Sequence, residues 1–171
     1  SVADALRVLG PLSDADLLER GGEVGWAEQL AEQRRAVRLR LPPGERWVAV
    51  EDLGRLRDAL GIPLPAGVSG AFAEAVADPL GDLLSRFART HGPFDTAEAA
   101  AALGLGPAVV TGTLERLAAQ GRLVRGAFRP GRVGSEWCDS DVLRQIRRAS
   151  LALVQRSVEP VPAERLCGFL P

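Results

Sequence analysis

The chain contains no lysine, tyrosine, asparagine or methionine, and all 21 of its basic residues are arginine. The four missing residue types share AT-leaning codons, so we interpret the bias as the mark of a GC-rich bacterial genome. It also has a chemical consequence. Without lysine the chain cannot build a phosphate-binding loop of the G-x-x-x-x-G-K-[ST] type or a lysine Schiff base. We therefore expect this piece to have no ATPase activity. Its acids are scattered singly and form no carboxylate pair with a spacing suited to acid–base catalysis, so we expect no catalytic residue, and we expect no cofactor.

Cysteine and histidine are also scarce. Cys138 and Cys167 lie far apart and match no metal or redox spacing, which predicts two reduced, packed cysteines of a cytoplasmic protein. The single His91 is expected at a helix end, so a zinc site or a Ser-His-Asp triad has too little to build on. No apolar run approaches the roughly 18 residues of a spanning helix, and no signal peptide is visible. The missing initial methionine suggests a piece of something longer.

The chain of 171 residues is organised around the stretch 92–150. Asp95 and Glu98 have the spacing of a capping box, which starts one helix. Leu-Gly-Leu-Gly at 103–106 breaks that helix, and Pro107 suits the first turn of the next one. Residues 123–128 and 136–138 then form the two strands of a hairpin, and a closing helix follows. Helix, turn, helix and β-wing together predict a winged helix.

An ordered series of matches relates the first third of the chain to this stretch. The pairs are Leu30 with Leu117, Val37 with Val124 and Leu41 with Phe128 at an offset of 87, then Trp47 with Trp137 and Leu56 with Ile146 at an offset of 90. The change of offset places a three-residue insertion in the second hairpin turn. Ser13-Asp14 likewise corresponds to Asp95-Thr96 at the helix starts. We interpret the series as a tandem duplication.

The predicted fold is therefore mainly α with small β-hairpins, an α+β class, in two tandem winged-helix domains. The expected boundaries are 1–61 for the first domain, 62–78 for a linker, 79–157 for the second domain and 158–171 for a C-terminal helical extension. Trp26 is expected to point inward. Trp47 and Trp137 are expected to plug equivalent gaps between wing and helices, with a base-stacking platform as the alternative. The extension carries an apolar face, Leu166, Phe169 and Leu170, predicted to pack on a neighbouring domain.

The two halves differ in charge. Residues 1–77 hold nine arginines against twelve acids, whereas residues 116–148 hold eight arginines against three acids. Because neutralised phosphates supply most non-specific nucleic-acid affinity, the basic stretch indicates contact with a phosphate backbone; a solvated charged face is the alternative. The predicted nucleic-acid-binding residues are Arg116, Arg122, Arg125, Arg129, Arg132, Arg144, Arg147 and Arg148.

Within that set, Arg129 and Arg132 flank Pro130-Gly131 at the tip of the second hairpin. We expect this tip to extend into solvent and to bring both guanidinium groups to a phosphate backbone. The second helix of the motif offers only Arg116 and Gln120 for bidentate base contacts, and both lie late in a helix that should use its N-terminal end. Backbone contact without base readout is therefore expected, with DNA or RNA.

Four segments carry a family resemblance: Pro79-Leu80-Gly81-Asp82-Leu83, Arg89-Thr90-His91-Gly92-Pro93-Phe94, Glu136-Trp137-Cys138-Asp139, and VLRQIRRASL at 142–151. With them, residues 46–171 resemble the large helicase-related (Lhr) proteins. Those are bacterial ATP-dependent helicases of the DEAD/DEAH-box class, tied to DNA repair. The resemblance implies a fragment of their C-terminal tandem winged helices, with the ATP and magnesium sites in a motor that lies elsewhere.

Three functions are open at this point. The first is an accessory nucleic-acid-binding module of such a helicase, with DNA as the expected ligand. The second is a structural scaffold whose winged helices pack on each other or on other domains of the parent protein. The third is a glycosylase, because the family's C-terminal region resembles winged-helix DNA glycosylases, but no glycosylase motif can be placed on this sequence. No membrane partner is expected.

Overall fold

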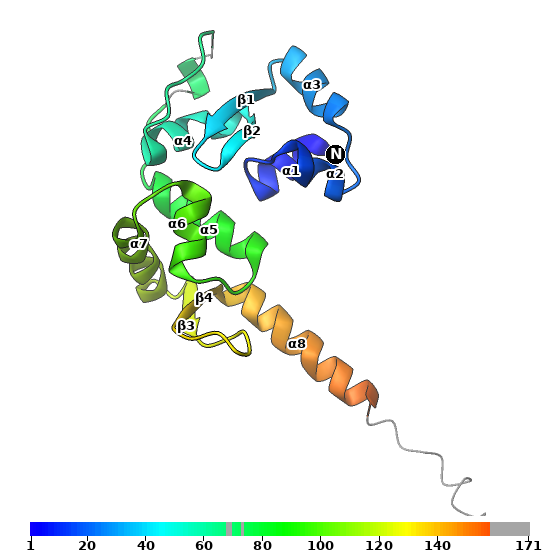
Figure 1. Cartoon of the computed structure of the whole chain (residues 1–171), viewed down its shortest axis with the longest axis vertical. Coiled ribbons are helices and arrows are strands. Elements are labelled where there is room, and N and C mark those ends of the chain that lie inside the picture. Colours follow the sequence, from blue (N-terminus) through cyan, green and yellow to red (C-terminus); the bar gives the residue numbers. More distant parts are fainter. Residues whose placement is uncertain (68–69, 73, 158–171) are drawn as a thin grey trace, which may run out of the picture.

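The computed structural model describes residues 1–67, 70–72 and 74–157. The predicted extension 158–171, with Cys167 and the apolar residues Leu166, Phe169 and Leu170, lies outside the described residues. Figure 1 shows two helical units, each with a small hairpin, and one long helix that projects from the second unit. We call α1 to α4 the first unit and α5 to α8 the second unit.

The first unit has the order of a winged helix. Its elements are α1 (Val2–Leu9), α2 (Asp14–Glu19), α3 (Val24–Glu32), β1 (Ala36–Leu41), β2 (Gly44–Ala49), the 3-10 turn η1 (Val50–Asp52) and α4 (Leu53–Leu60). Ser1 and Ser13 begin α1 and α2 with capping boxes. Leu6, Leu17 and Trp47 pack in one buried cluster, so the wing closes over the helices.

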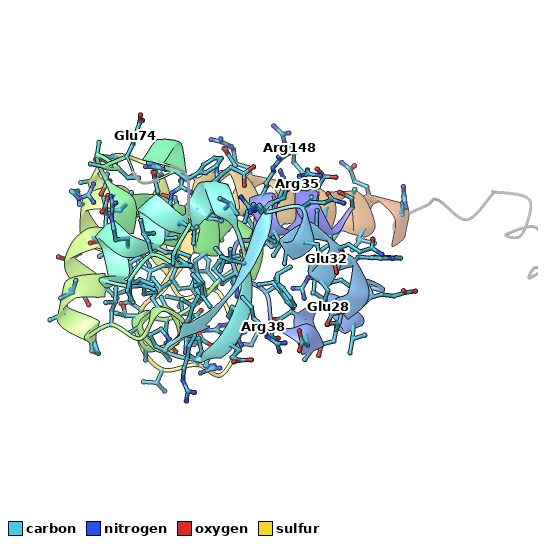
Figure 2. All side chains as sticks on the ribbon, turned by 90° about the horizontal axis from the view of Figure 1, so that it is seen from above. Glu28, Glu32, Arg35, Arg38, Glu74 and Arg148 are labelled. Atoms are coloured by element: carbon cyan, nitrogen blue, oxygen red, sulfur yellow. The ribbon has the colours of Figure 1, made fainter. Side chains whose placement is uncertain are left out.

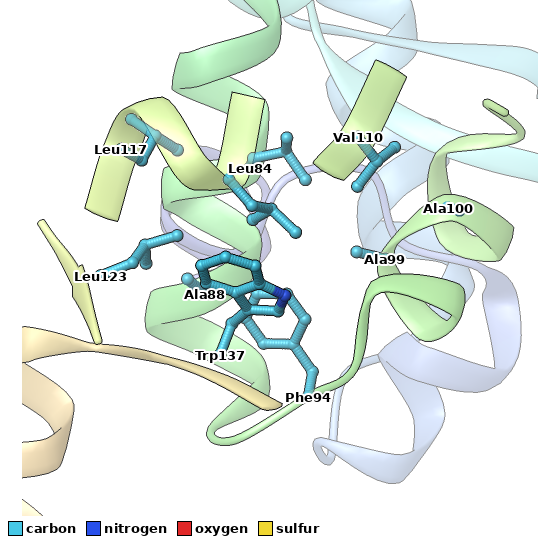
Figure 3. Close-up of a cluster of buried hydrophobic side chains, with 10 residues drawn as sticks. Leu84, Ala88, Phe94, Ala99, Ala100, Val110, Leu117, Leu123 and Trp137 are labelled. Atoms are coloured by element: carbon cyan, nitrogen blue, oxygen red, sulfur yellow. The ribbon is translucent and has the colours of Figure 1, made fainter. Parts of the chain in front are cut away.

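The second unit repeats this order after the 3-10 turn η2 (Gly70–Phe72). Its elements are α5 (Pro79–His91), α6 (Thr96–Leu103), α7 (Pro107–Ala119), β3 (Leu123–Gly126), β4 (Glu136–Asp139) and α8 (Ser140–Ser157). The capping box of Asp95 and Glu98 and the place of Pro107 in the first turn of α7 are both confirmed. Figure 3 shows the resulting core, in which Phe94 and Trp137 pack beside Leu84 of α5.

The two units are structural equivalents, as the duplication predicts. Trp47 exchanges two backbone hydrogen bonds with Leu12, at N···O distances of 3.0 and 2.7 Å. Trp137 exchanges the same two bonds with Phe94, also at 3.0 and 2.7 Å. Both indoles are almost fully buried. The prediction of equivalent aromatic plugs is therefore confirmed, and this burial leaves neither ring face open as a base-stacking platform.

The two units share a packed interface. Helix α4 lies against α5, and Leu53, Leu56 and Leu83 belong to one buried cluster that spans both units. Asp52, which is 4% exposed, accepts hydrogen bonds from both terminal nitrogens of Arg86, at 2.5 and 3.0 Å. Arg55 of α4 also donates to Asp52, so this buried carboxylate joins arginines of both units. Without Asp52, the largely buried guanidinium of Arg86 would lose the carboxylate that compensates its charge. We therefore expect the units to move as one body.

The first wing adds a second contact between the units. Gly104 ends α6 in the left-handed conformation, with φ 64° and ψ 34°. A Cβ at this position would lie 2.0 Å from the Cβ of Pro42, at the turn of the first wing. The glycine therefore serves two purposes, because it allows the positive φ and leaves room for the wing. The tip of the first wing is seated on the α6–α7 turn.

Three sequence expectations need comment. Trp26 is 45% exposed, so the prediction that it points inward was wrong: α3 turns Ala27, fully buried, toward the core instead. The second hairpin is shorter than predicted, since β3 ends at Gly126. The boundaries 1–61, 62–78 and 79–157 stay a prediction.

Among the described helices none is by itself long and apolar enough to cross a membrane, and α6 and α7 reach that length only jointly, across a 116° bend.

Candidate nucleic-acid interface

The second wing is held by a cluster of charges that includes Arg129. Its Nε donates to the Glu136 carboxylate, and its two terminal nitrogens donate to the Glu98 carboxylate at 2.9 and 2.7 Å. Glu136 is 2% exposed and also accepts the backbone N–H groups of Phe128 and Arg129, each at 2.8 Å. The hydrogen bonds that Arg129 donates to Glu98 lower the pKa of Glu98 to about 2. The expectation that Arg129 projects into solvent was wrong, because Glu98 and Glu136 draw it back onto α6.

Three further arginines of the predicted set also have carboxylate partners. Arg132 lies 3.7 Å from Asp95 and 3.6 Å from Glu98, so the other side of the wing tip is drawn to α6 as well. Arg116 donates two hydrogen bonds of 2.8 Å to Asp78, the cap of α5, and these hydrogen bonds lower the pKa of that carboxyl. Arg144 pairs with Asp141 one turn earlier in α8.

The remaining four arginines, which we call the open arginines, are Arg122, Arg125, Arg147 and Arg148. All four are exposed, and none has a carboxylate oxygen within 4.0 Å among the residues that the structure describes. Arg147 and Arg148 share a face of α8 with Arg144, because residues three and four apart are neighbours on a helix. The backbone carbonyl of Arg122 accepts the N–H of Ser140, which places it at the start of α8.

Arg125 has a counterpart in the first unit, and the two differ in their partners. The guanidinium of Arg38 lies 5.3 Å from the ring centre of Trp47, and that of Arg125 lies 5.4 Å from the ring centre of Trp137. Asp14 accepts a hydrogen bond from the indole nitrogen of Trp47 at 2.7 Å, and Thr96 accepts the equivalent bond from Trp137 at 3.0 Å.

Only the first of these two arginines is neutralised. Arg38 pairs with Asp14 at 2.7 Å and with Glu45 at 3.0 Å. In the second unit, threonine stands at the position of Asp14, and the offset of 90 places Ser135 at the position of Glu45. The same arginine–tryptophan arrangement therefore has two carboxylates in one unit and none in the other. Among the described residues, the charge of Arg125 thus has no carboxylate partner.

Helices α3 and α7, each the second helix of a helix-turn-helix, offer few side chains that could contact base edges. The hydroxyls of Thr111 and Thr113 in α7 donate back to the carbonyls of Pro107 and Val109. With Arg116 engaged by Asp78, α7 has few donors left for base edges. Helix α3 exposes acids instead, and Figure 2 labels two of them, Glu28 and Glu32. Such a face repels a phosphate backbone.

Other chemistry is sparse in the described part of the chain. No group of three His, Cys, Asp or Glu residues that could hold a metal ion occurs among the described residues. Cys138 is buried, and burial raises the pKa of its thiol, so it is a poor nucleophile. His91 is the last residue of α5, where its ring stacks on Phe87 at 3.9 Å.

Sequence reasoning missed the residues that decide which arginines are open. Glu98 was identified only as a capping residue, and Glu136 only as part of a strand. The aligned helix starts already place Thr96 opposite Asp14, which was a usable signal. It could not be interpreted, because the sequence does not show that both side chains lie next to a tryptophan–arginine pair.

Comparison with known proteins shows which proteins the chain is similar to. Residues 1–75 match the winged-helix domain of the large helicase-related protein. The chain is 47% identical over 173 aligned residues, 99% of its length, to "Lhr helicase/ probable uracil glycosylase" of Mycolicibacterium smegmatis (strain ATCC 700084 / mc(2)155). It is 33% identical over 98% of its length to "Lhr helicase/uracil glycosylase" of Escherichia coli (strain K12). It spans only 12% and 11% of these two relatives.

A solved structure shows a weaker likeness. RV1404 from Mycobacterium tuberculosis aligns with a TM-score of 0.34 at 19% identity, covering 67% of this chain and 73% of that one, a likeness too low to bear on the fold. The two relatives match nearly the whole chain, and the winged-helix match covers its first unit. The chain is therefore similar to the large helicase-related proteins: its first 75 residues match their winged-helix domain, and nearly all of it aligns with a short part of two Lhr helicases.

Proposed function

We propose that the second unit holds the backbone of nucleic acid, DNA first, without reading its sequence, while the first unit serves as its scaffold. The observation that carries the proposal is the contrast between Arg125 and Arg38, which have the same tryptophan contact but different charge partners. An arginine that is positioned by an aromatic ring and has no carboxylate partner is suited to bind phosphate.

The other open arginines extend the same surface. Arg147 and Arg148 lie on α8, which begins where the wing ends, and Arg122 lies at that junction. Four guanidinium groups correspond to as many as four phosphate contacts. Arg116, Arg129, Arg132 and Arg144 have internal carboxylate partners, so in this proposal they support the surface rather than form it.

The scaffold reading is favoured for the first unit. Its wing tip is seated on the α6–α7 turn, its α3 exposes acids, and its Arg38 is neutralised. In this reading the first unit fixes the orientation of the second, and nucleic acid does not contact it.

The parent protein supplies the wider context. We propose an ATP-dependent DEAD/DEAH-box helicase of DNA repair, which works in the cytoplasm and holds ATP and magnesium in a motor outside this segment. The printed names of the relatives combine a helicase with a uracil glycosylase. In our proposal this segment contributes nucleic-acid contact to such a protein and carries out neither reaction.

The matched pair Arg125→Ala and Arg38→Ala tests the proposal. Each variant removes one guanidinium from above a buried tryptophan, so any general effect on the wing is common to both. Fluorescence anisotropy with a labelled 20-base-pair duplex should show binding by Arg125→Ala about fivefold to tenfold weaker at 0.1 M salt, as expected for one lost phosphate contact. Arg38→Ala should bind like the unaltered chain. Equal affinities for the two variants would contradict the proposal and favour a scaffold role for both units.

A second variant tests the mechanism by adding a group. Thr96→Asp gives the second unit the carboxylate that Asp14 provides in the first, and an acid in the first turn suits a helix N-terminus. The new carboxylate should neutralise Arg125 and weaken binding as much as Arg125→Ala does. The double variant should bind no worse than either single one. Losses that add in the double variant would show that the carboxylate acts on something other than Arg125.

A further inference from the structure

Helix α8 has an apolar face that no described residue covers beyond its first turns. Leu143 is 8% exposed, whereas Ile146 is 42% and Leu153 is 67% exposed. At 100° per residue these three side chains and Ala149 lie along one side of the helix, and Gln155 lies on the opposite side. Figure 1 shows that the C-terminal half of α8 extends away from both units.

The equivalent face in the first unit is covered. By the offset of 90, Leu143 and Ile146 of α8 correspond to Leu53 and Leu56 of α4. Leu53 and Leu56 are each 1% exposed, in a buried cluster to which both the first unit's own hairpin and α5, the first helix of the next unit, contribute; the residue from α5 is Leu83. Helix α4 thus shows how the apolar face shared with α8 is covered when a following helix, α5, is present.

We infer that in the longer parent chain the apolar face of α8 carries the first helix of a following domain, as α4 carries α5. The two relatives are about eight and about nine times as long as this chain, so the parent protein has ample sequence from which such a helix can come. The proposal does not depend on nucleic-acid binding.

The sequence also indicates how this interface differs from the first one. At the position of Asp52 the offset of 90 places Val142, so α8 lacks the carboxylate that holds Arg86 of α5. A buried arginine on the docking helix would have no partner there. The expected occupant is therefore an amphipathic helix that presents leucine-like side chains, with no arginine at the position equivalent to Arg86.

The test is hydrogen–deuterium exchange of α8 in two samples, the 171-residue chain and the full-length parent protein. Amides of residues 146–156 should exchange at least tenfold more slowly in the parent protein. Equal rates in the two samples would overturn the proposal. Exchange in α5 and α7 serves as the internal check that the second unit is folded in both samples.

A matched pair of variants assigns the protection to one face. Leu153→Glu and Gln155→Glu each add one carboxylate to α8, two residues apart and on opposite sides. In the parent protein Leu153→Glu should remove the protection and Gln155→Glu should keep it; protection that survives Leu153→Glu would overturn the proposal. Sedimentation of the 171-residue chain tests the other possible occupant of this face, a second copy of the chain. A monomer is expected, and a dimer that Leu153→Glu dissociates would assign the face to a second copy instead.

Discussion

Replacement of Gly104 by alanine tests whether the first wing is seated on the second unit. Two costs are expected. An alanine with positive φ costs roughly 1–2 kcal/mol. Its Cβ would also stand 2.0 Å from Pro42 Cβ and 2.2 Å from Pro42 Cγ, where carbon atoms in contact keep about 3.5–4.0 Å. Because a proline ring is stiff, the wing must retreat, and overpacking of this kind costs about 1–3 kcal/mol.

Gly61 provides the matched control. It ends α4 as Gly104 ends α6, with φ 68° and ψ 23° against 64° and 34°, but a Cβ at Gly61 meets nothing within 4 Å. Gly61→Ala therefore carries the backbone cost alone. The difference between the two variants isolates the contact with the wing, and we expect Gly104→Ala to be the less stable by about 1–3 kcal/mol.

Urea unfolding of the three proteins gives these free energies, provided that the slopes agree. Pro42→Gly removes the ring, so combining it with Gly104→Ala should recover most of the extra loss, which a double-mutant cycle measures. If Gly104→Ala and Gly61→Ala lose the same stability, or if Pro42→Gly restores nothing, then the wing does not rest on the α6–α7 turn in solution.

Two further predictions concern charges. Glu98→Gln keeps the capping box but removes the charge, so it should lower stability at pH 7 by up to about 1 kcal/mol, since the Glu98 side chain is 38% exposed and partly screened. Because Arg129 lowers the pKa of Glu98 from 4.5 to about 2, this contribution is complete above about pH 4.5 and is lost as the pH falls toward 2. Urea unfolding at several pH values should show the two proteins converge in acid; a constant difference would rule out the charge as its cause. Asp52→Ala should cost about 3 kcal/mol, because it leaves the largely buried Arg86 unpaired and takes from Arg55 one of its two carboxylate partners. Asp52→Leu combined with Arg86→Met should be less harmful than either substitution alone, and an additive loss would argue against a buried pair.

Local signals predicted the fold well. The capping box at Asp95 and the proline that starts α7 act over a few residues, so the sequence displays them directly. The duplication added long-range information, since it predicted equivalent sites for Trp47 and Trp137, and both form the same isolated bridge in the structure. The prediction that Trp26 points inward was wrong because α3 is short and two of its faces carry apolar residues. The periodicity therefore did not decide which face is buried.

The candidate site was harder to predict, because charge counts do not show pairing. Eight arginines between residues 116 and 148 suggest a basic surface, but four of them have carboxylate partners in the structure. Arg129 meets Glu98 across 31 residues and Arg116 meets Asp78 across 38. Such pairs depend on how helices are oriented, which local patterns do not specify. Whether the open arginines bind nucleic acid stays a prediction.

The salt dependence of duplex binding is the most direct test of the proposed surface. For the unaltered chain, the logarithm of the binding constant should fall with the logarithm of salt concentration with a slope of about −3 to −4, because each of up to four phosphate contacts contributes roughly 0.9. Replacing Arg122, Arg125, Arg147 and Arg148 together by alanine should bring the slope close to zero, equally on two unrelated duplexes. A slope that the four substitutions leave unchanged would contradict the account.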